Sequence, residues 1–142
     1  MPIRFHFQAS TKLNNRRKLK EFMPSLFLRE RKELGELDIV FCDNAYLLAI
    51  NQQYLKHNFY TDIITFDLST GPKAMIIGEL YISVEMVREN AIKYKVKFIT
   101  ELYRVIFHGA LHLCGYKDKT KKDISLMRAK EEQYLKMFHG EH

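Results

Sequence analysis

The alternation of apolar and polar residues predicts four strands and five helices along the chain. Period-two alternation and clusters of β-branched and aromatic residues are typical of strands, and apolar residues at helical spacing are typical of helices. We expect strands over 2–8, 37–42, 61–67 and 75–83, and helices over 14–34, 44–53, 84–95, from a cap at Thr100 to Gly115, and 120–138. This order predicts a single α/β (α+β) domain over residues 1–142, in which about five helices pack on a four-stranded mixed sheet.

Residues with strong local preferences set the expected boundaries of these elements. Ser83 and Thr100 are good N-caps for the helices that follow them. Gly35 indicates a turn, and Pro24 predicts either a kink in the first helix or its division into two helices. If the strand at 78–83 has an exposed edge, that edge could pair with an extended ligand.

The overall composition fits a folded chain with an anionic partner. Hydrophobic residues make up 46% of the 142 residues, which excludes a disordered protein. No apolar run is long enough to span a membrane, and the N-terminus alternates like a strand instead of carrying a signal-peptide core. Cys42 and Cys114 are far apart and indicate no disulfide framework, so we expect a cytoplasmic protein without a membrane partner. The net charge of +6 favours a partner such as nucleic acid, although charge alone is weak evidence.

The strongest chemical signal lies at residues 107–118. His108 and His112 are four residues apart, so a helix places both imidazoles on one face. Gly115 can take the left-handed conformation that ends a helix, and the chain can then bring Asp118 back towards the histidines. Two histidines and one carboxylate leave a zinc ion with an open position, as catalytic zinc sites have. We therefore expect one Zn²⁺ per chain at this helix and turn, although a histidine pair alone is often an ordinary surface or core feature.

This stretch resembles the signature of the YbeY family, His-Gly-x-Leu-His-Leu-x-Gly-Tyr-Asp-His. Lys117 stands where the family has aspartate, and Asp118 stands where it has a third histidine ligand. Residues 50–55, 61–66 and 78–83 resemble three further stretches of the family, so the resemblance covers nearly the whole chain. The positions that match the signature in register are His108, Gly109, Leu111, His112, Leu113, Gly115 and Tyr116.

The resemblance implies a metal-dependent endoribonuclease specific for single strands. It implies a role in 3′-end maturation of 16S rRNA and in ribosome quality control. The implied partners are rRNA and the small ribosomal subunit with its proteins, and no DNA partner is expected. An arginine that the family associates with activity falls on Leu55, and the adjacent basic residues Lys56 and His57 are candidate substrate contacts. The sequence does not identify a general base.

Several basic residues near the histidines are candidate phosphate contacts. Arg104 lies one helical turn before His108, and a guanidinium can bind a phosphate as a planar fork. Lys117 and Lys119 flank the expected carboxylate ligand, although a lysine-rich loop is more often simply solvated. Glu101 is expected either to orient Arg104 or a histidine, or to be an ordinary helix-end carboxylate with an ion pair.

Two other functions compete with RNA cleavage. A zinc peptidase usually carries His-Glu-x-x-His, with that glutamate as general base, but Gly109 occupies the glutamate position here. A ribosome-associated binding factor with a mainly structural metal remains the second alternative, because the family's arginine is absent at Leu55.

Overall fold

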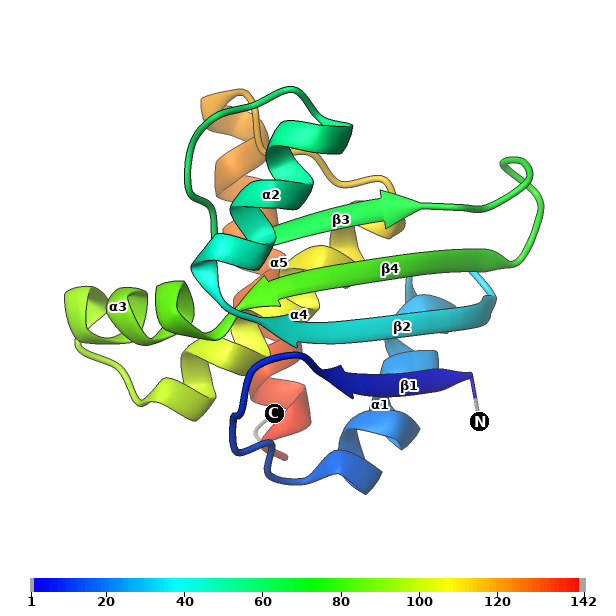
Figure 1. Cartoon of the computed structure of the whole chain (residues 1–142). Helices are drawn as coiled ribbons and strands as arrows, with labels where there is room; N and C mark the ends of the chain where they lie inside the picture. Colours follow the sequence, from blue (N-terminus) through cyan, green and yellow to red (C-terminus); the bar gives the residue numbers. More distant parts are fainter. Residues whose placement is uncertain (1, 141–142) are drawn as a thin grey trace.

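The structure, a computed structural model, describes residues 2–140 and contains four strands and five helices in the predicted order (Figure 1). They form a single α+β domain, so the predicted fold class is confirmed. The strands are β1 (Ile3–Phe7), β2 (Leu34–Cys42), β3 (Ile63–Asp67) and β4 (Ile76–Ser83). The helices are α1 (Arg16–Arg29), α2 (Asn44–Tyr54), α3 (Val84–Tyr94), α4 (Phe98–Leu113) and α5 (Lys121–Phe138).

The sheet is mixed, with strand order β1-β2-β4-β3. β1 and β4 run parallel to β2, whereas β3 runs antiparallel to β4. Because β4 has a partner on both sides, residues 78–83 offer no exposed edge with which an extended ligand could pair. The outer strands of the sheet are β1 and β3, and β3 is the one that lies near the functional site.

Helices cover both faces of the sheet unequally. In Figure 1, α2 lies in front of the strands, while α1, α4 and α5 lie behind them. The larger core lies between the sheet and these three helices, and a small second cluster of Cys42, Leu47 and Ile64 lies under α2. Ile63 and Ile64 contribute to opposite faces, as the alternation of a strand requires.

Two glycines let α4 lie unusually close to the sheet. A Cβ atom at Gly109 would come within 2.7 Å of the Ile63 Cδ1 atom and 2.8 Å of Leu80 Cδ2. A Cβ atom at Gly78 in β4 would come within 2.6 Å of Leu113 Cδ1. These distances are too short for real contacts, so a larger residue at either position would force the packed side chains or the helix to shift. The absence of side chains at these two positions therefore sets the distance between α4 and the sheet.

Several boundaries differ from the sequence-based expectations. α4 begins at Phe98 with Lys97 at the N-cap, so the cap expected at Thr100 is wrong, although Glu101 still lies in the first turn. Gly35 lies within β2 at a register shift instead of forming a turn. α1 ends at Arg29 because Arg31 takes a left-handed conformation, with φ of 63°. Pro24 lies inside α1 without dividing it.

Both cysteines are free thiols, as the sequence indicated. Burial raises the pKa of Cys42 and of Cys114 to about 12, which makes their thiolates scarce near neutral pH. Within residues 2–140, no helix combines the length and apolar character that crossing a bilayer requires.

Candidate metal centre

The two histidines of α4 face each other one turn apart. Their ring centroids lie 4.6 Å apart with the planes nearly perpendicular, and the Nε2 atoms of His108 and His112 lie 3.0 Å apart. Both side chains are half-buried at the bottom of a cleft. The helix therefore produces the juxtaposition that the spacing predicted.

Asp118 reaches the same point from the turn after α4. Gly115 has φ of +105°, the left-handed region that lets the chain reverse after the helix. The Asp118 Oδ2 atom lies 3.2 Å from His112 Nε2 and 3.4 Å from His108 Nε2. The structure thus brings the three expected ligand residues together as a group that could hold a metal ion.

The spacing of the three donor atoms fits one small cation. Ligands about 2.0–2.2 Å from a tetrahedral zinc ion are separated from one another by about 3.3 Å. The three separations seen here, from 3.0 to 3.4 Å, match that value. The donor atoms of His108, His112 and Asp118 therefore have a spacing that fits the zinc ion expected from the sequence.

The outer nitrogen of each histidine has its own partner. His108 Nδ1 lies 2.6 Å from Glu131 Oε2 of α5, and His112 Nδ1 lies 2.8 Å from the backbone oxygen of Tyr116. A carbonyl oxygen only accepts, so His112 carries its proton on Nδ1, and the carboxylate favours the same tautomer at His108. Both Nε2 lone pairs then point at each other and at a carboxylate. Three acceptors at such distances repel unless a cation or proton lies between them.

A buried ionic network supports His108 from below. The Arg104 guanidinium donates to both oxygens of Glu101, at 2.9 and 2.6 Å, and to Glu131 Oε1 at 2.9 Å. Both glutamates are almost completely buried. Burial alone would raise the pKa of Glu131, but hydrogen bonds and charges from His108 and Arg104 outweigh it and hold that pKa below its usual value.

This network bears on the interpretation of two residues. Glu101 pairs with Arg104 in the first turn of α4, which fits both roles that the sequence left open, the orienting role and the ordinary ion pair. Arg104 lies one turn before His108 as expected, but three of its N–H groups are already donated to carboxylates. The arrangement therefore favours a scaffolding role for Arg104 over the phosphate contact expected from the sequence.

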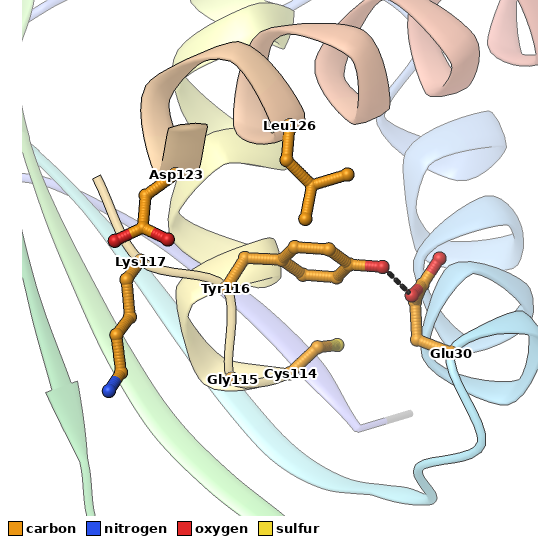
Figure 2. A pocket seen from close by; sticks show the side chains of 7 residues that line it. All are labelled: Glu30, Cys114, Gly115, Tyr116, Lys117, Asp123 and Leu126. Atoms are coloured by element: carbon orange, nitrogen blue, oxygen red, sulfur yellow. Dashed lines mark hydrogen bonds between the residues drawn. The ribbon is translucent and has the colours of Figure 1, made fainter. Parts of the chain in front are cut away.

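The turn that carries Asp118 is anchored to α1 and α5 through Tyr116. Figure 2 shows the Tyr116 hydroxyl donating to Glu30 Oε1, at 2.6 Å, beside a pocket that Cys114 and Lys117 also line. Glu30 also accepts a hydrogen bond from Tyr134 and one at 3.3 Å from Lys130. Since the backbone oxygen of Tyr116 accepts from His112, this anchor holds both the turn and one of the histidines.

The three ligand residues lie in an open cleft of about 670 Å³ between α4, β3 and the loop after α2. Of the candidate substrate contacts, His57 and Lys119 line this cleft. Lys117 lines the pocket on the other side of the turn. Lys56 is exposed in the loop, with a left-handed φ of 55°, and is not among the residues that line the cleft.

Two acidic residues near the histidines were missed as site residues in the sequence. Glu131 lies far along the chain in α5, and only packing brings it to His108. Asp62 lines the cleft and lies 3.8 Å from Arg104 Nη2. Burial raises the pKa of Asp62 above its usual value, although Arg104 and His108 counteract the shift. In the sequence, Thr61-Asp62 matches the motif at 61–66, but it is equally typical of a turn.

The protein is an α+β domain with a mixed four-stranded sheet. Its central helix and the following turn place a His-His-Asp group that could hold a cation in an open cleft. The YbeY family model, described as endoribonuclease YbeY, matches residues 6–139. The chain belongs to the YbeY family.

Individual relatives agree with this assignment. The chain is 48% identical over 137 residues to the endoribonuclease YbeY of Flavobacterium psychrophilum, and the match covers 96% of each chain. It is 42% identical over 139 residues to that of Flavobacterium johnsoniae, covering 98% of this chain and 99% of the relative. The solution structure of a Thermotoga maritima protein superposes with a TM-score of 0.66 and 26% identity, over 97% of this chain and 89% of that one.

Proposed function

We propose that this protein is a zinc-dependent endoribonuclease that cleaves single-stranded RNA. Its proposed role is maturation of the 16S rRNA 3′ end and ribosome quality control in the cytoplasm, with the small ribosomal subunit and its proteins as partners. The observation that carries the proposal is the group of His108, His112 and Asp118 in an open cleft, in a chain whose relatives are named endoribonucleases. The net charge of +6 suits an RNA substrate.

The chain's own residues would hold and orient the reacting groups. His108, His112 and Asp118 would hold a zinc ion, which would supply Lewis acidity toward a phosphate oxygen or a water molecule. Glu131 and the Tyr116 carbonyl keep the protons of both imidazoles on Nδ1, so that the Nε2 lone pairs face the cleft. Lys119, at the cleft, offers a positive charge to the RNA backbone. No residue is assigned as the general base.

The position of Gly109 weighs against a peptidase. The peptidase motif needs a glutamate directly after the first histidine, with its carboxylate at the metal. Here that position points at the sheet, where a Cβ atom alone would collide with Ile63 and Leu80. A glutamate general base is therefore absent from position 109, and any side chain there would require Ile63 and Leu80 to move.

A cleavage assay separates the enzyme from a ribosome-binding factor with a mainly structural metal. Zinc-loaded protein is expected to cut single-stranded RNA, to spare duplex RNA and peptides, and to stop cutting when a chelator removes the metal. Leu55→Arg is expected to raise the rate, because Leu55 lines the cleft and stands where the family has an arginine. RNA binding without cleavage, unchanged by Leu55→Arg, would make the binding factor the better account.

The two lysines that flank Asp118 are expected to differ in their effect on RNA binding. Lys119→Ala should weaken binding and reduce its salt dependence by about one phosphate contact, because Lys119 lines the cleft. Lys117→Ala is the matched control, since Lys117 is also exposed but lines the pocket on the other side of the turn. RNA affinity is measured by fluorescence anisotropy over a range of salt concentrations. An equal loss of affinity in both variants would contradict the placement of Lys119 alone at the RNA site.

A further inference from the structure

The cleft has two walls of different chemistry. One wall carries the three candidate metal ligands, His108, His112 and Asp118, together with Lys119. A bound cation and a lysine both suit a phosphate. Another part of the lining, here called the aromatic wall, comes from the loop after α2 and includes Leu55, His57 and Phe59. Phe59 is 55% exposed, so its ring is accessible to a ligand at the rim of the cleft. A ligand that contacts both parts of the lining would combine an anionic group with a flat apolar face.

The rings of His57 and Phe59 form one stacked pair. Their centroids lie 5.1 Å apart with an angle of 22° between the planes. Two nearly parallel rings offer a larger flat surface than either offers alone, and every nucleobase has a face that can extend such a stack.

A buried asparagine holds the pair in place. Asn51, at the end of α2, is 1% exposed and donates its side-chain amide to the backbone oxygen of Phe59 at 2.9 Å. Its backbone oxygen accepts from the N–H of His57 at 3.1 Å and from that of Leu55 at 3.2 Å. One residue thus fixes three positions of the aromatic wall, and the wall is part of the folded scaffold of the cleft.

We propose that the Phe59–His57 pair is a stacking platform for a nucleobase of single-stranded RNA whose adjacent phosphate lies at His108, His112 and Asp118. This inference rests on the proposed function and deepens it. Bases inside a duplex are already stacked and paired, whereas the unstacked bases of a single strand can lie on protein aromatic rings. The platform would therefore supply the preference for single strands, and it would tolerate different bases because stacking does not read hydrogen-bond patterns.

The test compares a short oligouridylate with an abasic oligonucleotide of the same length, which keeps the phosphates but lacks the bases. Binding to zinc-loaded protein is followed by fluorescence anisotropy, and gels confirm that the RNA is still intact when binding is read. Phe59→Ala is expected to weaken binding of the oligouridylate by about tenfold and to leave binding of the abasic strand unchanged. Tyr60→Ala is the matched control, because Tyr60 is 59% exposed in the same loop but is not among the residues that line the cleft.

A second variant tests stacking directly. The chain contains no tryptophan, so Phe59→Trp places a single indole on the platform. The oligouridylate is expected to quench its fluorescence, and the abasic strand to leave it unchanged. Tyr60→Trp should show much weaker quenching.

The possible outcomes separate this inference from the proposed function. Equal effects of Phe59→Ala and Tyr60→Ala, or equal affinity for both oligonucleotides, would overturn the platform even if the protein cleaves RNA. Base-dependent binding through Phe59 without cleavage would support the platform and count against the nuclease. If an apolar peptide is held through Phe59 and RNA binding is unaffected by Phe59→Ala, the wall is a peptide subsite and the inference fails.

Discussion

Zinc is expected to be lost from this protein when either His108 or His112 is replaced by alanine. Each substitution removes one of three donors whose atoms lie 3.0–3.4 Å apart, and the two that remain cannot hold a small cation tightly. The zinc content of the purified protein, measured by metal analysis, should fall from about one ion per chain to nearly none, and RNA cleavage should disappear with it. The fold should survive, because a domain of this size has a sufficient core without the metal.

Asp118→His is the matched comparison for these variants. It restores the donor type that the family signature has at this position, and imidazole is a good zinc ligand. Zinc content should therefore be kept or increased. Full retention of zinc in both histidine variants would show that the cleft does not bind the metal through these residues.

Arg104→Ala is expected to have the largest effect on stability. Removing the guanidinium leaves Glu101 and Glu131, whose side chains are each 3% exposed, without their charge partner. Loss of one member of a buried ion pair costs about 3 kcal/mol, which corresponds to a fall in melting temperature of roughly 10 °C. Denaturant unfolding monitored by circular dichroism measures the change.

Arg128→Ala provides the control, because Arg128 is an exposed arginine of α5 near the same network. Its free energy of unfolding should change by less than about 0.5 kcal/mol. If Arg104 acts instead as a phosphate contact, Arg104→Ala should weaken RNA binding and leave the unfolding transition almost unchanged. The two roles of Arg104 are therefore distinguished by whether the substitution changes the free energy of unfolding or the affinity for RNA.

The sequence predicted the parts of this molecule that depend on local spacing. The i, i+4 histidines and the glycine after them determine a local geometry, because a helix and a left-handed residue have few alternatives. The order of elements followed from periodicity in the same way. Ser83 caps α3 through its side chain as expected, with its oxygen accepting from the Met86 N–H at 3.2 Å.

Long-range contacts were the part that the sequence did not reveal. Glu131 reaches His108 only because α5 packs along α4, and nothing in the local sequence of α5 distinguishes it from neighbouring glutamates. The role of Asn51 was hidden for a similar reason, because it depends on how the following loop folds back. Thr100 resembled a cap, but the actual cap is Lys97, three residues earlier, and Phe98 at the start of the helix packs against the core.

The close approach of α4 to the sheet has a consequence for how the centre acquires its ion. His108 and His112 are set by a helix that two glycines hold against the strands, so these donors are positioned before any ion arrives. Asp118, with 44% of its side chain exposed, lies on a short turn outside that packing. Capturing an ion then requires settling only of the residues beyond the anchored Tyr116, and hydrogen exchange on adding zinc should slow at residues 117–119 and remain unchanged along α4.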